Sequence, residues 1–268
     1  MAAELKTIQW NIGGGKILAD GKDPSILDSY SEDGLDHIIE VIQKEDPDIV
    51  TLQEAHQSQP FLIARALGYE GWMNHPMSPS HIDKWEKLAL GCISKNYIVS
   101  TSVDPLTTPA WQAQWEDGSM VTPHQKAVAH YLVDIDGGEP LAVQNLHLFP
   151  FRRFGIDLGS AEAAPVLREV EEKVGNWAAP RIVQGDFNLN NESLKTFLPA
   201  LFDGGLEEIV QQEPTTPKGS RPDHVLFSGM TAVSSVVIKE VLTDHYPIVT
   251  TFGFDMADVI PFINRRRN

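Results

Sequence analysis

The segment Arg181–Asn188, which reads RIVQGDFN, places an acid and an amide two residues apart directly after a short apolar run. Residues at positions i and i+2 of an extended backbone point to the same side, so Asp186 and Asn188 are expected to face one spot. Open α/β sheets carry their chemistry just past the strand ends. Carboxylate and amide oxygens at such an end are the donors that hard divalent cations prefer. Taken alone, the tetrapeptide Gly185–Asn188 also fits an ordinary turn.

Other predicted strand ends carry polar residues of the same kinds. They hold Asn11 before three glycines, Glu54, His147, Asp223, and the pair Asp244 and His245. Each of these residues taken singly fits a turn, a helix cap or a surface position. Gathered in one cleft, three Asp, one Glu, two Asn and two His would be unfavourable unless a metal or a substrate neutralised them. The set therefore predicts a metal-assisted anion site.

The elements that must position these residues are mostly short strands rich in Val, Ile, Leu and Thr. The predicted strands are Leu5–Ile12, Ile49–Gln53, Leu88–Ser94, Lys126–Val133, Leu141–Leu148, Arg181–Gln184, His224–Phe227, Val233–Glu240 and Pro247–Phe254. The predicted helices are Leu35–Lys44, Pro60–Leu67, Ala161–Trp177 and Glu192–Leu198. Asp136-Gly137-Gly138 is typical of a hairpin turn between two of the strands.

Strands outnumber helices in this pattern, which favours a layered α/β structure with mixed or antiparallel sheets over a Rossmann alternation. The 268 residues show no composition shift and no repeat, so one domain spanning 1–268 is expected. Two long segments, Met73–Lys87 and Thr107–Gln125, read as irregular. They are either substrate-binding or lid segments, or loops whose tryptophans cover the edge of the core.

Composition limits the class of protein. No apolar run approaches membrane-spanning length and no apolar leader follows Met1, so a cytoplasmic protein is expected. The single cysteine, Cys92, excludes a disulfide framework and reads as a buried inert thiol. The sequence does not indicate an oligomeric state.

Charge bears on the partner. The net charge is −16, whereas non-specific nucleic-acid binders usually carry a basic face. The dense basic patches are Arg152-Arg153 and the tail Arg265–Arg267, and the tail reads as a solvated terminus.

The order of the polar motifs and their residue types resemble those of the endonuclease/exonuclease/phosphatase superfamily. The resemblance rests on Trp10-Asn11-Ile12, Leu52-Gln53-Glu54, Asn145-Leu146-His147-Leu148, Gly185-Asp186-Phe187-Asn188, Asp223-His224 and Thr243-Asp244-His245. It runs from Asn11 to His245, nearly the whole chain. It implies a deoxyribonuclease I-like four-layer α/β/β/α sandwich with the site at one edge of the two sheets.

The resemblance also implies roles. Glu54 is similar to the family's main Mg²⁺ (or Mn²⁺) ligand, helped by Asn11 and Asp244. Asp186 is similar to the residue that orients or deprotonates the attacking water. The phosphate contacts implied are Asn188, His245 with Asp223 fixing its ring, and His147 as a second contact or general acid.

A finer likeness concerns Arg152, five residues after His147. A His-Leu-x-x-x-Arg pattern is similar to the tyrosyl-DNA phosphodiesterase branch, in which the guanidinium contacts the substrate phosphate. The alternative is a solvated loop charge. The neighbouring Phe149, Phe151 and Phe154 either stack on a base or simply pin the loop.

The sequence therefore predicts a divalent-metal-dependent phosphoesterase, most simply a phosphodiesterase that uses direct water attack. Its substrate is either a nucleic-acid end, which the Arg152 pattern favours, or a small metabolite or lipid head group, which the net charge favours. A non-catalytic binding module on the same fold is a third alternative. An intact set of Glu54, Asp186, Asn188 and His245 argues against it.

Overall fold

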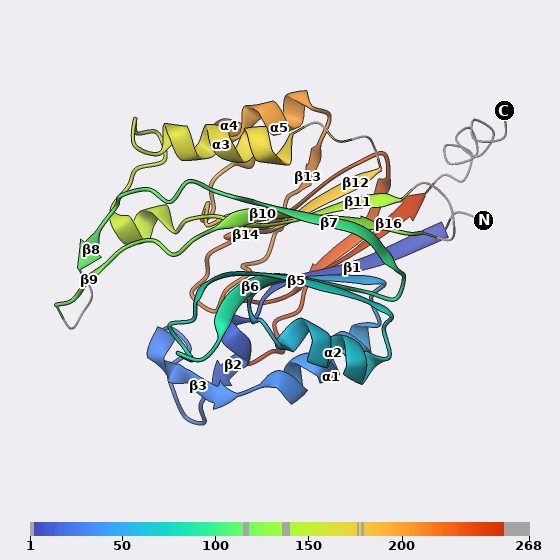
Figure 1. Ribbon diagram of the computed structural model, residues 1–268, viewed down its shortest axis with the longest axis horizontal. Coiled ribbons are helices and arrows are strands. Elements are labelled where there is room, and N and C mark those ends of the chain that lie inside the picture. Colours follow the sequence, from blue (N-terminus) through green and yellow to red (C-terminus); the bar gives the residue numbers. More distant parts are fainter. Residues whose placement is uncertain (1–2, 115–117, 136–139, 176, 178–179, 255–268) are drawn as a thin grey trace.

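Two mixed β-sheets pack face to face, and helices cover the outer face of each, as Figure 1 shows. The computed structural model describes residues 3–114, 118–135, 140–175, 177 and 180–254. Within these residues the layers run helix, sheet, sheet, helix from one side to the other. The predicted four-layer α/β/β/α sandwich of the deoxyribonuclease I type is confirmed.

The first sheet has six strands. Their spatial order is β15 (Thr231–Val237), β16 (Ile248–Phe254), β1 (Ala3–Asn11), β4 (Ile49–His56), β6 (Lys87–Ser94) and β5 (Gly71–Pro79). Only β1 and β4 pair in parallel, and the chain between them contains α1 (Leu35–Glu45). A parallel pair needs such a long crossover. Together with α2 (Gln59–Leu67), α1 lies on the outer face of this sheet.

The second sheet repeats the scheme. Its order is β13 (Glu207–Ile209), β14 (Asp223–Ser228), β12 (Arg181–Asp186), β11 (Leu141–His147), β10 (Ala127–Val133) and β7 (Ile98–Pro105). Its one parallel pair is β11 with β12, joined through α3 (Ala164–Val174). The short helices α4 (Leu194–Phe197) and α5 (Pro199–Asp203) lie beside α3 on the outer face. Two small antiparallel pairs complete the described strands, β2 (Lys16–Leu18) with β3 (Tyr30–Asp33) and β8 (Ala113–Gln114) with β9 (Met120–Val121). Three short 3-10 helices, η1 (Gly13–Gly15), η2 (Leu27–Ser29) and η3 (Phe151–Phe154), lie in the connections.

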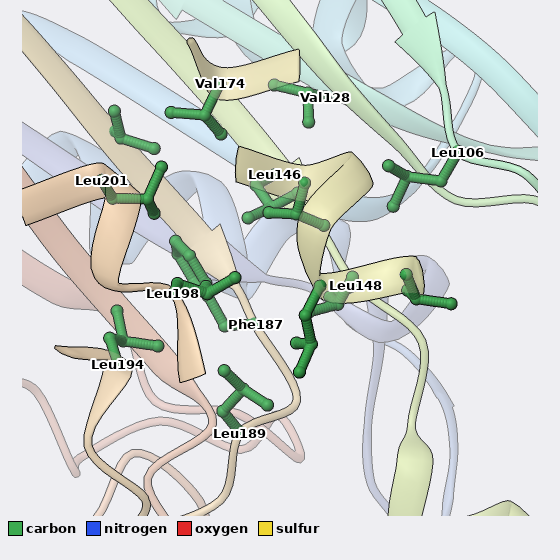
Figure 2. Close-up of a cluster of buried hydrophobic side chains, with 14 of the residues drawn as sticks. Leu106, Val128, Leu146, Leu148, Val174, Phe187, Leu189, Leu194, Leu198 and Leu201 are labelled. Carbon is green, nitrogen blue, oxygen red and sulfur yellow. The ribbon is translucent and has the colours of Figure 1, made fainter. Parts of the chain in front are cut away.

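Three buried apolar clusters hold the layers together. One lies between the sheets and includes Ile49, Tyr131 and Phe252. A second joins α1 and α2 to the first sheet. The third joins α3, α4 and α5 to the second sheet, where Leu146, Phe187 and their neighbours interdigitate in Figure 2. Burial of these apolar faces is the main force that fixes the strand ends in space.

Some sequence-based boundaries were wrong. Strand β5 occupies much of Met73–Lys87, which had been read as irregular. The prolines of this segment, Pro76 and Pro79, are tolerated because β5 is an edge strand with a register shift at Pro76. Strand β7 was not predicted. Its exposed positions lack an apolar alternation, because it too lies at a sheet edge.

The long helix is also shorter than predicted. Instead of Ala161–Trp177 it spans Ala164–Val174, and Gly175 ends it with a φ of 53°. Residues Asp136, Gly137 and Gly138, predicted as a turn, lie outside the described residues, and the flanking strands β10 and β11 pair antiparallel. Cys92 is fully buried in β6, as expected. Among the described helices, none is long and apolar enough to cross a membrane.

Candidate active site

Strand register brings three of the predicted site residues into one row. In the second sheet, His147 at the end of β11 pairs with Asp186 at the end of β12. Asp186 in turn pairs with Asp223 at the start of β14. All three residues are at least 95% buried. Because paired residues in adjacent strands point to the same face of a sheet, the row presents two carboxylates and an imidazole side by side.

Glu54 comes from the other sheet, at an irregular point of β4. The pairing of β4 with β6 shifts register between Leu52 and Ala55, and Glu54 has a φ of 49°. Left-handed backbone is uncommon for a residue with a side chain, and β-bulges often aim side chains at functional sites. Here the bulge turns the Glu54 carboxylate toward His147, whose Nε2 lies 3.7 Å from Glu54 Oε1.

A histidine–aspartate pair forms the opposite side of the site. His245 Nδ1 lies 2.9 Å from Asp223 Oδ2, and its Nε2 lies 3.9 Å from Asp186 Oδ2. Burial would lower the pKa of His245, but Asp223 and then Asp186 and Asp244 outweigh burial and raise that pKa well above its usual value. The imidazole is therefore protonated at neutral pH, which suits contact with an anion.

Asp186 is held from both sides. Its Oδ2 accepts a hydrogen bond from Asn11 Nδ2 at 3.0 Å, and its Oδ1 accepts one from the backbone N–H of Asn188 at 2.9 Å. Burial raises the pKa of Asp186 to about 6, with a smaller contribution of the same sign from Asp223 and an opposing one from His245. A carboxylate with such a pKa is matched to proton transfer near neutral pH.

Asn188 sits in the left-handed region, with a φ of 54°. Its side-chain Nδ2 donates a hydrogen bond to Leu148 O at 2.9 Å, which ties the loop after β12 to the loop after β11. An amide nitrogen has two protons, so this bond leaves one for another acceptor.

Lys126 is a site residue that the sequence analysis missed. Its Nζ lies 3.6 Å from Glu54 Oε1 and 2.6 Å from His147 Nε2, and the lysine is 91% buried. Burial lowers the pKa of Lys126, which Glu54 and Asp186 oppose. Burial and then Lys126 lower the pKa of His147 well below its usual value, so this imidazole is neutral and can accept a hydrogen bond from the Lys126 ammonium.

A signal for Lys126 was present. It begins the predicted strand Lys126–Val133, and its neighbour Ala127 pairs with His147. Pairing that strand antiparallel with the next would have placed Lys126 beside the end of β11. A lysine at the start of a strand differs from the acids, amides and imidazoles that mark the other strand ends of the site.

Two of the expected oxygen donors, from Asn11 and Asp244, lie beside the same glycine. The Asn11 Oδ1 accepts the backbone N–H of Gly13 at 3.1 Å, and a Cβ on Gly13 would lie only 2.9 Å from Asp244 Oδ1, so these two oxygens flank one glycine. Burial raises the pKa of Asp244, His245 opposes this, and Glu54 raises it further. Two carboxylates that repel each other beside an amide oxygen are a fitting donor set for Mg²⁺ or Mn²⁺.

A group of three residues on the other side of the site meets the distance requirement for a cation. The ligand atoms of Asp186, Asp223 and His245 lie within 4.8 Å of one another, and among the described residues no other group of three His, Cys, Asp or Glu does so. His245 and Asp223 are already hydrogen-bonded to each other. This cluster therefore has fewer free lone pairs than the oxygen donors around Glu54.

Arg152 lies at the surface. Its side chain is 62% exposed, and Nη2 lies 3.4 Å from both Glu192 Oε1 and Asn190 O. The next residue, Arg153, is the one whose guanidinium interacts electrostatically with Glu54; burial lowers its pKa and Glu54 raises it.

The phenylalanines around this arginine pair face the core. Phe149 and Phe151 are fully buried and pack with Trp111, at ring-centroid distances of 6.0 and 5.2 Å. Phe154 contacts the same indole at 6.1 Å. The contacts favour the interpretation in which these rings pin the loop, and they make Trp111 part of the core edge.

Comparison with known proteins agrees with the fold. The sequence model described as Endonuclease/Exonuclease/phosphatase family matches residues 8–245. No curated protein matches the chain.

Solved structures share the fold at low sequence identity. An endonuclease/exonuclease/phosphatase from Beutenbergia cavernae DSM 12333 superposes with a TM-score of 0.70 at 20% identity, over 94% of this chain and 72% of that one. Humanized D. rerio TDP2 gives 0.61 at 18% identity, over 93% and 98%. ANGEL2, described as a 2',3'-cyclic phosphatase, gives 0.60 at 16% identity, over 94% and 96%.

Proposed function

Since this chain belongs to the endonuclease/exonuclease/phosphatase family, we propose that it is a divalent-metal-dependent phosphoesterase that hydrolyses a phosphodiester by direct attack of water. The observation that carries the proposal is the His245–Asp223 pair facing Asp186, with 3.9 Å between His245 Nε2 and Asp186 Oδ2. At this spacing a protonated imidazole can donate a hydrogen bond to a phosphate oxygen while a carboxylate of raised pKa accepts a proton from a water.

Each of three residues on this side of the site has one role in the reaction. Asp186, with a pKa of about 6, is mostly ionised at neutral pH and takes a proton from the attacking water. The water oxygen bonds to phosphorus as the ester P–O bond breaks, and the leaving alkoxide takes a proton from solvent. His245 donates from Nε2 to a non-bridging phosphate oxygen while Asp223 fixes its ring. The second amide proton of Asn188 is directed to the same phosphate. Charge that develops on the phosphate in the transition state is stabilised by these preorganised donors.

The other half of the site lies around Glu54. Glu54, Asp244 and Asn11 would hold the cation, which when bound supplies Lewis-acid stabilisation of phosphate oxygens. Lys126 adds a fixed positive charge beside Glu54, and it donates to His147. Burial would raise the pKa of Glu54, but neighbouring cationic groups, Lys126 foremost, outweigh burial and lower it to about 2. Glu54 is therefore ionised, and ready to bind a cation, throughout the physiological range.

The test is hydrolysis of bis(p-nitrophenyl) phosphate with Mg²⁺ or Mn²⁺. Asp186→Asn is expected to lower kcat/KM by roughly 10²- to 10⁴-fold, the usual contribution of a general base. Asp104→Asn is the matched control, because Asp104 also pairs with a histidine, His130, at 3.0 Å but in β7. Equal activity of Asp186→Asn and wild type would refute the mechanism.

A further inference from the structure

Two histidines stack at the rim of the site, on the side of Glu54. His81 lies in the turn between β5 and β6, and His124 lies between β9 and β10. Their ring centroids are 5.4 Å apart, with 26° between the ring planes. Both histidines are exposed, and neither ring forms a hydrogen bond within the described part of the chain. One histidine comes from each of the two long segments, Met73–Lys87 and Thr107–Gln125, and neither segment contains a proposed catalytic residue.

This histidine pair adjoins the catalytic residues. His124 lines one hollow together with Glu54, Lys126 and His147. His81 interacts electrostatically with Glu54 and helps to lower the pKa of that carboxyl group. A ligand bound at Glu54 can therefore extend onto the two rings.

The electrostatics around His124 favour an anion. Burial lowers the pKa of His124, and His81, Lys126 and Arg153 lower it further, while Glu54 alone acts in the opposite direction. A second group with negative charge beside the rings would relieve this repulsion. In the proposed function the carboxylate of Glu54 binds the cation. The negative charge that offsets Lys126 and Arg153 beside His124 must therefore come from the substrate.

A metal ion fits the histidine pair poorly. Zinc, which binds imidazole nitrogens, takes three or four protein ligands in its catalytic and structural sites. Among the described residues, the group of three potential ligands that lies close enough together is Asp186, Asp223 and His245, which includes neither His81 nor His124. The unbonded ring nitrogens of the pair instead offer N–H donors to phosphate oxygens.

We propose that His81 and His124 form a subsite for a second, non-scissile phosphate, so that the substrate is a small phosphodiester that carries an additional phosphate monoester. The inference rests on the proposed function, since it takes the scissile phosphate to lie between His245 and Glu54. It also accounts for a charge of −16 on the whole chain. A polyanion extending past the cleft would be repelled, whereas a compact bisphosphate meets only the N–H donors of the two histidines and the nearby charges of Lys126 and Arg153.

Matched ligands test the subsite independently of catalysis. In titration calorimetry with Mg²⁺ present, thymidine 3',5'-bisphosphate is expected to bind wild type about tenfold more tightly than thymidine 5'-monophosphate, the effect of one or two charge-assisted hydrogen bonds. In His81→Gln/His124→Gln the ratio of the two affinities is expected to fall to about one. His37→Gln, a substitution on α1, controls for loss of a histidine elsewhere and should keep the wild-type ratio. Equal affinities for the two ligands in wild type would overturn the subsite.

Hydrolysis separates the subsite from the proposed function. The 5'-p-nitrophenyl ester of thymidine 5'-phosphate and its 3'-phosphorylated counterpart share a leaving group, and the second should have the higher kcat/KM. Hydrolysis of both esters at equal rates would reject the subsite and leave the phosphodiesterase intact. Failure to hydrolyse either ester, with a tenfold binding ratio that His81→Gln/His124→Gln abolishes, would keep the subsite and reject the reaction.

Discussion

The side-chain amide of Gln9 donates a hydrogen bond to Asp223 Oδ1 at 3.0 Å, and so ties β1 of the first sheet to the histidine–aspartate pair of the second. The same nitrogen lies 2.7 Å from Gln53 Oε1, and Gln53 Nε2 donates to Asn145 Oδ1 at 2.7 Å. Asn145 then donates to the backbone of Leu52 and of Gly91. This buried chain of amides spans both sheets and fixes Asp223 relative to the strand that carries Glu54.

Asp223 depends on three donors. Besides Gln9 it accepts from Thr215 Oγ1 at 2.6 Å and from His245. Since a buried carboxylate is stable as an anion only when its oxygens are hydrogen-bonded, Gln9 is a positioning residue for the pair. It is also a residue that no pattern of acids and imidazoles in the sequence would have selected.

Replacing Gln9 by leucine should therefore affect both stability and activity. Loss of a donor to a buried carboxylate is expected to lower the free energy of unfolding by about 1–3 kcal/mol, measured by urea denaturation. Gln184→Leu is the matched control, because Gln184 bridges the same sheets to Ile8 O and Thr51 Oγ1 without touching Asp223. Both variants should lose stability, but only Gln9→Leu should move the basic limb of the pH–activity profile. Identical profiles for the two variants would make Gln9 purely structural.

The pH dependence of hydrolysis follows from two groups. Activity should rise as pH increases through about 6, because Asp186 must lose its proton to act as a base and its pKa is raised to about 6. Activity should fall at high pH as His245 loses its proton, above a pKa that Asp223 holds well above the usual value.

Asp223→Asn should move both limbs of this profile to lower pH. It removes the main influence that raises the pKa of His245 and one that raises the pKa of Asp186. The check is kcat/KM for bis(p-nitrophenyl) phosphate between pH 5 and 10 at constant ionic strength. A basic limb that stays in place would show that His245 is not the group responsible.

The layered α/β class followed from the sequence because short strands rich in Val, Ile, Leu and Thr that outnumber the helices are a local pattern, whereas the four-layer arrangement came from the family resemblance. The site motifs were readable because each lies at a strand end, and β-register then aligned His147, Asp186 and Asp223. Lys126 and Gln9 were missed because their roles come from pairing across strands and across sheets. The edge strand β5 was missed because Pro76 and Pro79 are compatible with a strand only where one side lacks a partner.

Lys126 should oppose cation binding at Glu54. Its ammonium lies 3.6 Å from Glu54 Oε1 in a buried setting, where repulsion of a nearby divalent ion is weakly screened. Lys126→Met is therefore expected to bind Mg²⁺ several-fold more tightly in titration calorimetry, while its kcat falls because a positive charge near the phosphate is lost. Lys87→Met, at the exposed start of β6, should leave both quantities as in wild type. Weaker Mg²⁺ binding by Lys126→Met would contradict this assignment.

The glycine loop after β1 offers the sharpest test of Asp244. A Cβ on Gly13 would lie 2.9 Å from Asp244 Oδ1, whereas a Cβ on Gly21 would meet nothing within 4 Å, although both glycines have positive φ. Gly13→Ala and Gly21→Ala should therefore each lower the free energy of unfolding by about 1–2 kcal/mol, the strain of a left-handed alanine. Only Gly13→Ala should also weaken Mg²⁺ binding, because Asp244 must move to make room for the methyl group. Unaltered Mg²⁺ affinity in Gly13→Ala, with the stability loss present, would remove Asp244 from the cation site and leave Glu54 and Asn11 as its donors.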